Sequence, residues 1–242
     1  FLDENGEKIS KTKGNGVTID EWLAYAPEES LAFYIYRDPR KAKQLSFSII
    51  PKAVDEYEQF LAAYPGQEWE KRLGNPVHHV HAGEVPPARM PISFALLLNL
   101  VAVASTDDKA LLWGFVRRYA PEASPESHPE LDRLIDFALA YFRDFIADSL
   151  RHRPASELEA AALRDLDARL ALLPDDADAE TIQTEVYEVG KAHPFESLRD
   201  WFKAQYEILL GTAQGPRMGS FIALYGIANS RKLIAEALAR EA

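Results

Sequence analysis

Lysine, hydroxyl and glycine residues alternate near the amino end of the chain, in a pattern suited to binding phosphate groups. Residues 8–16 read Lys-Ile-Ser-Lys-Thr-Lys-Gly-Asn-Gly. A lysine ammonium group is a compact positive charge, and glycine lets backbone N–H groups approach an anion closely. Ser10 and Thr12 add hydroxyl donors between the three lysines. The segment therefore predicts a loop that binds a triphosphate.

A solvated β-hairpin with scattered lysines is the alternative explanation of this segment. Asp3-Glu-Asn-Gly6 stands between Leu2 and Ile9, and an Asn-Gly pair favours the positive φ angles of a tight turn. The two interpretations are compatible, because a hairpin can lie beside a phosphate-binding loop. The length of the pattern favours the functional interpretation.

Composition is that of an ordinary globular protein with one large or two modest domains. The chain has 242 residues, of which 47% are hydrophobic and 27% are charged. It has no cysteine, which excludes disulfides and thiolate metal sites. No apolar run reaches the roughly 18–20 residues that span a bilayer, so we expect no membrane segment and a cytoplasmic location.

The net charge of −11 argues at first against nucleic acid as a partner. The charge is unevenly distributed, however. Residues 155–200 carry twelve acids against four bases, whereas residues 37–43 carry four bases against one acid. Because an RNA backbone meets local charge, the segment 37–43 is a candidate for phosphate contact. A solvated helix end is the alternative for this cluster.

Sequence patterns predict a mainly α-helical fold with a small mixed α/β part near the amino end. Alternating apolar and polar residues at Leu45–Ile49 predict a strand. The Pro- and Gly-rich stretch 74–91 predicts a linker and a domain boundary. From Pro91 onward the pattern is helical, and it includes a long amphipathic helix from Pro129 to about Arg151.

Capping residues mark further helix ends in the second half of the chain. Ser156 with Glu159 has the spacing of a capping box. Gly211 follows the helical pattern that begins at Leu198. These signals predict one helix that starts after residue 156 and another that stops before residue 211.

Residues 8–15 resemble the second signature of the class I aminoacyl-tRNA synthetases, Lys-Met-Ser-Lys-Ser, with Ile9 in place of methionine and Thr12 in place of the last serine. In that family an amino-acid carboxylate attacks the α-phosphate of ATP, and pyrophosphate leaves. Preplaced cations lower the barrier, because negative charge builds on the phosphates as the bond breaks. The resemblance implies two catalytic residues, Lys8 and Lys11. It also implies ATP, bound with Mg²⁺, as a substrate whose phosphates contact Ser10, Thr12 and Lys13.

Further segments are similar to the class I lysyl-tRNA synthetases in particular. They are Gly16–Leu23, Tyr25–Leu31, Arg37–Lys43, Ile50-Pro51 with Val54–Tyr57, Asn75–Val77, Ser93–Val101 and Gly215–Phe221. The glutamyl-tRNA synthetases share a related domain plan and are the nearest alternative. The resemblance implies the end of a catalytic domain at residues 1–16, a stem-contact domain at 17–90 and an all-helical anticodon-binding domain at 91–242.

On this basis we expect the C-terminal, tRNA-binding portion of a monomeric lysyl-tRNA synthetase. The full enzyme, by resemblance, activates L-lysine with ATP and transfers it to tRNA(Lys). The chain has no initiator methionine and no His-x-Gly-His signature, so we expect the catalytic half to be missing and the chain alone to be inactive. The expected tRNA contacts are the basic or aromatic residues Arg37, Arg40, Lys41, Lys43, Arg217 and Trp201. Core packing is the alternative for Trp201, which lies at helical spacing from other aromatic residues.

Three other possibilities stand beside this interpretation. His78, His79 and His81 suggest zinc, but no cysteine or tight His/Asp cluster supplies the remaining ligands, so no metal is predicted. A non-catalytic helical module that binds RNA or protein would keep the lysine loop without needing it. A purely structural helical domain would show no salt-dependent retention of tRNA.

Overall fold

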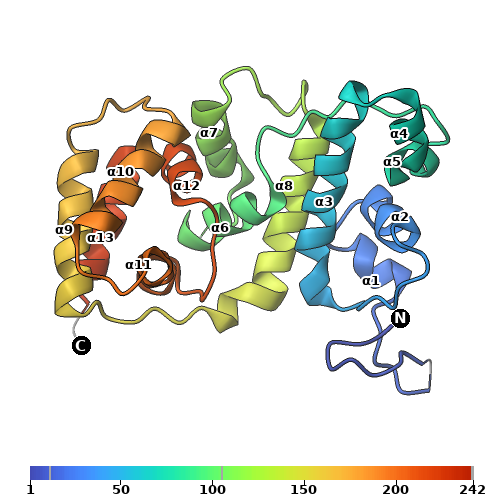
Figure 1. The fold of residues 1–242 in the computed structure, drawn as a ribbon, viewed down its shortest axis with the longest axis horizontal. Coiled ribbons are helices and arrows are strands. Elements are labelled where there is room, and N and C mark those ends of the chain that lie inside the picture. The colour runs from blue at the N-terminus through green and yellow to red at the C-terminus, as the bar shows by residue number, and fades with distance from the viewer. Residues whose placement is uncertain (11, 105, 241–242) are drawn as a thin grey trace. The chain divides into compact units, whose positions relative to one another are not determined.

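The computed structural model describes residues 1–10, 12–104 and 106–240 and is mainly α-helical, which confirms the predicted fold class. The helices belong to two compact units (Figure 1). Unit 1 contains Phe1–Ala95 and Pro125–Tyr141, and unit 2 contains Leu96–Ser124 and Phe142–Ala242. The predicted domains 1–16, 17–90 and 91–242 are defined by the ligands that they bind, ATP and RNA. The two units do not test those domains, which stay a prediction.

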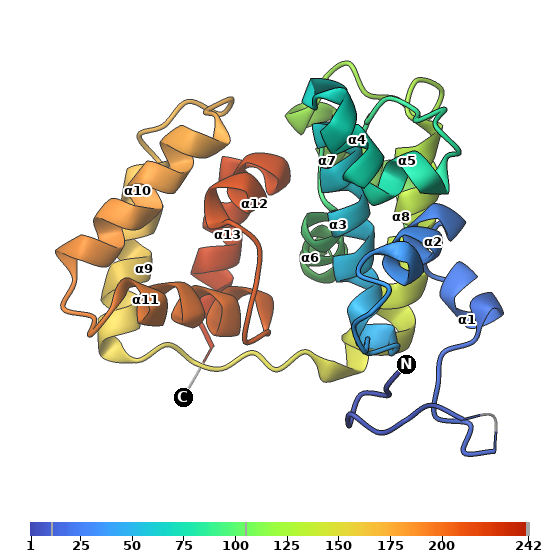
Figure 2. The same ribbon diagram turned by 45° about the vertical axis from the view of Figure 1, so that its right-hand side comes forward.

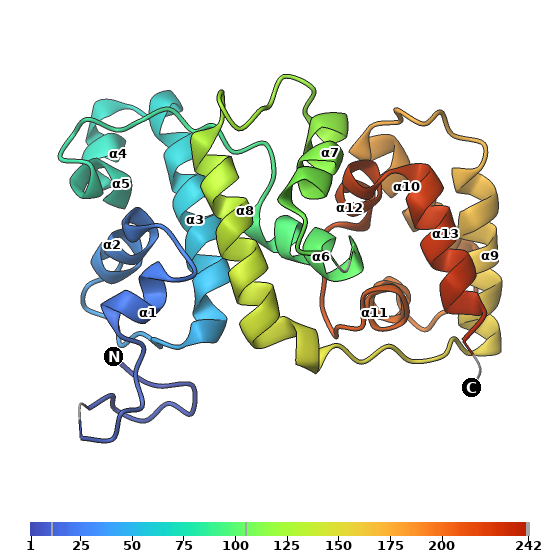
Figure 3. The same ribbon diagram turned by 180° about the vertical axis from the view of Figure 1, so that it is seen from behind.

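Unit 1 is built from short helices joined by turns. Its helical elements are α1 (Ile19–Leu23), α2 (Glu28–Tyr36), the 3₁₀ turn η1 (Phe47–Ile49), α3 (Ile50–Ala63), the 3₁₀ turn η2 (Tyr64–Gly66), α4 (Trp69–Gly74), α5 (Pro76–Val80) and α8 (Pro129–Tyr141). Helix α8 lies beside α3 although it is distant in sequence (Figures 1 and 3). Helix α6 (Phe94–Ala104) begins in this unit and continues in unit 2.

The core of unit 1 contains aromatic and aliphatic side chains from α2, α3 and α5. One cluster of this core contains the buried residues Phe33, Tyr57, Leu61 and Val77 together with Tyr64 of η2. Burial of such side chains contributes about 1.5–3 kcal/mol each to folding. This cluster therefore fixes the short helices that carry the residues of interest.

Polar residues in the segments similar to lysyl-tRNA synthetases stabilise the ends of the helices in unit 1. The Asp55 carboxylate accepts the backbone N–H groups of Phe94 at 2.6 Å and Ala95 at 3.1 Å, at the start of α6. The indole N–H of the fully buried Trp22 donates to the Ser30 hydroxyl at 3.1 Å. Such contacts satisfy donors that would otherwise lack a partner. Some of the residues that carry the resemblance therefore stabilise the fold, and need no ligand to explain them.

The predicted strand at Leu45–Ile49 is wrong, because residues 47–49 form the turn η1 that leads into α3. Pro51 lies in the first turn of α3, where a missing N–H costs no hydrogen bond. The hydroxyls of Ser46 and Ser48 are 2.9 Å apart and bond each other. Among the described residues, strand-like pairing is limited to isolated bridges between Leu2 and Lys8 and between Leu2 and Gln44.

The predicted linker at residues 74–91 also contains a helix, α5. Its Asn75 side chain accepts the Val77 N–H at 3.1 Å, and Pro76 is its first residue. Proline at this position starts a helix and does not break one. The irregular part of the segment is therefore shorter than predicted and follows Val80.

The regular elements of unit 2 are all helical in the described residues (Figure 2). They are α7 (Lys109–Tyr119), the π turn η3 (Phe142–Ile146), the 3₁₀ turn η4 (Ala147–Ser149), α9 (Glu157–Leu170), α10 (Ala179–Ala192), α11 (Leu198–Gln205), the π turn η5 (Tyr206–Leu210), α12 (Met218–Tyr225) and α13 (Ile227–Leu238). The predicted capping box at Ser156 and Glu159 is confirmed, and so is the helix end at Gly211, which has φ +70°. In the described part of the chain no helix has the length and apolar character needed to cross a membrane.

The predicted helix from Pro129 to about Arg151 is α-helical only as far as Tyr141, the last buried residue of its apolar stripe. The π turn η3 and the 3₁₀ turn η4 continue it to Ser149. Phe142, Phe145 and Ile146 are only half-buried, so they provide little core packing to hold a regular helix in place.

Helices α10 and α12 approach each other closely at Gly219. An added Cβ at Gly219 would lie 2.3 Å from the backbone oxygen of Ala179 and 2.7 Å from Cβ of Gln183. The Gly219 N–H donates to the buried side-chain oxygen of Gln183 at 2.8 Å. The second glycine of the Gly-Pro-Arg-Met-Gly segment is therefore required for helix packing.

Candidate functional site

The amino-terminal segment forms the predicted hairpin, and Asp3 organises it. The Gly6 N–H donates to the Asp3 backbone oxygen at 3.1 Å, and Gly6 has φ +79°. The buried Asp3 carboxylate accepts the N–H groups of Asn5 at 3.0 Å and Glu7 at 2.8 Å. Its second oxygen accepts the Asn15 side-chain amide at 2.7 Å. These bonds, the amide of Asn15 foremost, lower the pKa of the Asp3 carboxyl.

The lysine-rich loop is closed on itself by Ser10 and Asn15. The Ser10 N–H donates to the Asn15 side-chain oxygen at 3.1 Å, and the Gly14 N–H donates to the Ser10 backbone oxygen at 3.1 Å. Gly14 has φ +62°, which explains a glycine there. At Gly16 an added Cβ would lie 2.4 Å from Cγ2 of Ile9. Gly16 therefore accommodates a side chain of the loop itself, where we expected close approach of an anion.

The cations of this loop differ in their surroundings. Lys8 is exposed and pairs with no carboxylate among the described residues. Lys13 is exposed but pairs with Glu7 at 2.9 Å. Thr12 is also exposed, and the predicted catalytic Lys11 lies outside the described residues. The exposed Lys8 ammonium is thus available to an incoming phosphate.

Gln44 brings the hairpin and the basic segment 37–43 together. Its side-chain amide donates to the backbone oxygens of Asp3 at 3.1 Å and Glu4 at 2.9 Å. The Leu2 N–H donates to the Lys43 backbone oxygen at 2.8 Å. Two of the predicted cationic segments therefore adjoin each other in unit 1.

The four predicted bases of residues 37–43 are not equivalent. The Arg37 guanidinium pairs with Glu56 at 2.5 Å. The Lys43 ammonium donates to the backbone oxygens of Tyr34, Ile35 and Arg37 at the end of α2, and burial lowers its pKa. Lys41 is 75% exposed and lies 3.4 Å from Asp38.

Arg40 is exposed and forms no ion pair with a described residue. It and Lys41 are therefore the members of the segment that an RNA phosphate reaches most easily. Arg37 and Lys43 mainly stabilise the end of α2.

The two predicted RNA contacts of unit 2 differ as well. Arg217 is 49% exposed and pairs with Glu180 at 2.6 Å. Trp201 has no exposed surface, and its indole N–H donates to the Val186 backbone oxygen at 2.9 Å. A fully buried ring has no face on which a base can stack, so Trp201 is a core residue in this structure and we no longer assign it to the RNA contacts.

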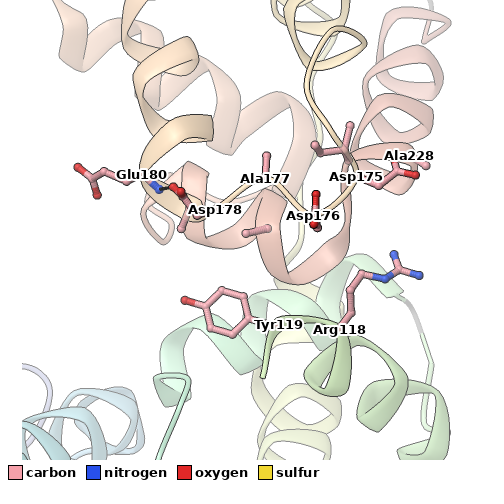
Figure 4. A pocket seen from close by; sticks show the side chains of 11 residues that line it. Arg118, Tyr119, Asp175, Asp176, Ala177, Asp178, Glu180 and Ala228 are labelled. Carbon is pink, nitrogen blue, oxygen red and sulfur yellow. Dashed lines mark hydrogen bonds between the residues drawn. The ribbon is translucent and has the colours of Figure 1, made fainter. Parts of the chain in front are cut away.

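The largest cavity described in unit 2, of about 950 Å³, lies between α7, α10 and α13 (Figure 4). Arg118 and Tyr119 come from the end of α7, and the acidic side chains come from the segment that leads into α10 and from the first turn of α10. These acids are Asp175, Asp176, Asp178 and Glu180. With four carboxylates against one guanidinium, the cavity disfavours a phosphate group.

A smaller cavity in unit 1, of about 160 Å³, contains three glutamates. They are Glu29 of α2, Glu58 of α3 and Glu130 of α8. Burial, together with the charges of Asp55, Glu130 and Glu29, raises the pKa of Glu58 to about 7. Glu58 therefore binds a proton near neutral pH and avoids a buried charge.

The three histidines of residues 78–81 make separate hydrogen bonds. His78 Nδ1 is 2.7 Å from the Tyr64 hydroxyl, His79 Nε2 is 2.8 Å from the Leu73 backbone oxygen, and His81 Nε2 is 2.9 Å from the Tyr57 hydroxyl. Within the described ranges, no group of three or more His, Asp or Glu side chains is arranged to hold a metal ion. The histidines thus link α5 to its neighbours.

Comparisons with known proteins support the family resemblance that the lysine-rich loop indicates. A family model described as "tRNA synthetases class I (K)" matches residues 1–84. A lysine–tRNA ligase of Roseobacter denitrificans is 53% identical over 241 residues, which are 100% of this chain and 46% of that protein. Lysine–tRNA ligases of Rickettsia bellii and Rickettsia felis are each 48% identical, over 98% and 97% of this chain and 46% and 45% of their own lengths.

The chain therefore spans about half the length of the curated relatives it matches. Within that half the similarity is continuous and covers both units, which the motifs alone did not establish. The chain belongs to the class I lysyl-tRNA synthetase family.

Proposed function

We propose that this chain is the C-terminal, tRNA-binding portion of a lysine–tRNA ligase. The full protein would activate L-lysine with ATP and transfer it to tRNA(Lys), acting as a monomer in the cytoplasm. The observation that supports this most strongly is similarity to lysine–tRNA ligases over the whole chain, at 53% identity in one case.

In this proposal the amino-terminal loop binds the ATP phosphates. Lys8 and Lys11 stabilise the charge that develops as pyrophosphate leaves, with Ser10, Thr12 and Lys13 as additional contacts. The exposed ammonium of Lys8, which pairs with no carboxylate in the described part of the chain, and the hydrogen bond from Ser10 to Asn15 support this role. Mg²⁺ enters with ATP and is bound by its phosphates.

The tRNA contacts of the proposal lie in both units. Arg40 and Lys41 meet phosphates of the RNA stem, and Arg217 is a further contact in the anticodon-binding region. Phosphate contacts position an RNA without reading its sequence. The exposed positions of Arg40 and Lys41 beside the hairpin support this assignment.

A pyrophosphate-exchange assay on the full-length protein tests the proposed reaction. We expect exchange into ATP that depends on lysine and Mg²⁺ and is absent with glutamate. Exchange that depends on glutamate would contradict the proposal and support the glutamyl-type alternative. The 242-residue chain alone is expected to be inactive in this assay while retaining salt-dependent tRNA binding.

A further inference from the structure

Four aromatic rings form a continuous series on one side of unit 1. Tyr36 ends α2, Trp69 begins α4, and His78 and His79 lie in α5. The ring centroids of Tyr36 and His79 are 5.0 Å apart, those of His79 and His78 are 5.3 Å apart, and those of His78 and Trp69 are 5.8 Å apart. Helices α2, α4 and α5 lie near one another in every view (Figures 1 to 3). We call these four residues the ring surface.

The two ends of the ring surface are open to solvent. Tyr36 is 47% exposed and Trp69 is 62% exposed. By contrast, Trp22, Trp113 and Trp201 are at most 4% exposed. A group of neighbouring exposed rings, unlike a single exposed side chain, is typical of a surface that contacts a partner.

The middle of the ring surface is held in a fixed orientation. His78 bonds the Tyr64 hydroxyl at 2.7 Å, and His79 bonds the Leu73 backbone oxygen at 2.8 Å. A ring that is already ordered loses little side-chain entropy when a ligand stacks on it. The hydrogen bonds of the two histidines therefore prepare the surface for a flat ligand.

The charge next to the ring surface is positive, in a chain whose net charge is −11. Residues 35–43 and 67–73 carry six bases against three acids, although Arg37 pairs with Glu56 and Lys43 bonds backbone oxygens at the end of α2. Arg40 and Lys41 follow Tyr36 by four and five residues and are exposed, and Lys71 follows Trp69 by two. An apolar protein surface would make no favourable contact with these cations. RNA can contact both features, because its bases stack on rings and its phosphates pair with cations.

We propose that the ring surface binds unpaired nucleotides of the tRNA, whose bases stack on Trp69 and Tyr36 while their phosphates meet the neighbouring cations. This proposal rests on the tRNA-binding function proposed above, and it adds a contact to a single-stranded part of the RNA. Stacking is tolerant of base identity, because every base has a flat face. The ring surface would therefore add affinity and not sequence specificity.

The fluorescence of Trp69 gives a direct test in the 242-residue chain, because the other three tryptophans are buried. The probe is a tRNA transcript with a lysine anticodon, and a blunt RNA duplex of similar length is the comparison. Acrylamide, an uncharged quencher, measures how accessible the exposed tryptophan is. We expect tRNA, but not the duplex, to quench this fluorescence and to protect it from acrylamide.

Variants give a second measurement of the same contact. Trp69→Leu and Tyr36→Leu should each raise the Kd for tRNA about tenfold, whereas Trp69→Phe, which keeps a ring, should stay close to the unmodified chain. Tyr187→Leu is the matched control, because Tyr187 is an exposed ring of α10 (41%) outside the ring surface. Circular dichroism confirms that each variant is folded.

The outcomes separate this inference from the proposed function. If tRNA binds with unchanged affinity to Trp69→Leu, or leaves Trp69 accessible to acrylamide, the stacking proposal is overturned and a protein becomes the expected partner of this surface. If the unmodified chain binds no tRNA at any salt concentration, the proposed tRNA-binding function fails, and the stacking proposal fails with it.

Discussion

The lysine loop of residues 8–16 and the Gly-Pro-Arg-Met-Gly segment of residues 215–219 both resemble synthetase sequences, yet the structure uses them differently. The lysine loop is held by local hydrogen bonds and leaves Lys8 exposed and unpaired among the described residues. The segment 215–219 joins α12 to α10 through Gly219 and pairs Arg217 with Glu180. Helix packing therefore explains Gly219 of the segment 215–219, whereas the exposed Lys8 of the lysine loop fits the ligand chemistry proposed for it.

The largest expected effect belongs to the lysine loop. In the full-length protein, Lys8→Ala should lower kcat for lysine-dependent pyrophosphate exchange roughly 100- to 1000-fold, because a preplaced charge acts mainly on the transition state. The KM for lysine should change little. The control is Lys232→Ala, which removes a lysine with a 77% exposed side chain in unit 2. Equal rates for the two variants would show that the loop has no part in the reaction.

The next effect concerns folding and belongs to the segment 215–219. Gly219→Ala should destabilise the chain by about 1–3 kcal/mol, because the added Cβ would meet backbone 2.3 Å away. Gly16→Ala should cost less than about 1 kcal/mol, because its neighbour is the Cγ2 methyl of the Ile9 side chain, which can move by rotation about χ1, and not a backbone atom. Urea unfolding measures both variants. If Gly16→Ala lowered the free energy of unfolding more than Gly219→Ala does, the lysine loop and not the segment 215–219 would be the more important for stability.

A smaller effect is expected at Arg217. Its ion pair with Glu180 is largely exposed, so Arg217→Gln should change the free energy of unfolding by less than about 1 kcal/mol. If Arg217 contacts an RNA phosphate, the slope of log Kd for tRNA against log salt concentration should be smaller by about one unit in Arg217→Gln. Arg231→Gln, which breaks a pair with Asp167 at 2.8 Å, is the control. An unchanged slope for Arg217→Gln would leave this residue with a structural role only.

The smallest effect is expected at Asp3, which holds the lysine loop closed. Its lowered pKa means that the closing contribution is present above the ordinary value of 3.8 and is lost as pH falls through the lowered pKa. At neutral pH, Asp3→Ala should increase the hydrogen-exchange rate of the Glu7 amide several-fold, because that N–H donates to Asp3. Exchange at the same rate in both proteins would show that other contacts close the loop.

The sequence predicts features set by neighbouring residues better than contacts between residues that are distant in the chain. The hairpin at Asp3–Gly6, the capping box at Ser156 and the helix end at Gly211 each depend on a few neighbouring residues, and each is confirmed. The strand at Leu45–Ile49 is wrong because its period-two pattern arises from two serines that bond each other in a turn.

Other features depend on contacts between distant residues and have no local signal. The ring surface is one, because among the described residues Tyr36 and Trp69 are linked through histidines of a third helix. The histidine pattern suggests zinc, whereas the partners of the histidines in the structure are Tyr57, Tyr64 and Leu73. The burial of Trp201 likewise follows from its position against α10, which its residue type does not reveal.

Pyrophosphate exchange and tRNA affinity, measured side by side in two variants of the full-length protein, test the role of the lysine loop most directly. We expect Lys8→Ala to lose exchange at least 100-fold and to keep its Kd for tRNA. We expect the double variant Arg40→Ala with Lys41→Ala to keep lysine-dependent exchange, and its log Kd for tRNA to depend on log salt concentration with a slope smaller by about two units. Normal exchange in Lys8→Ala would contradict the proposal that the amino-terminal loop binds the ATP phosphates.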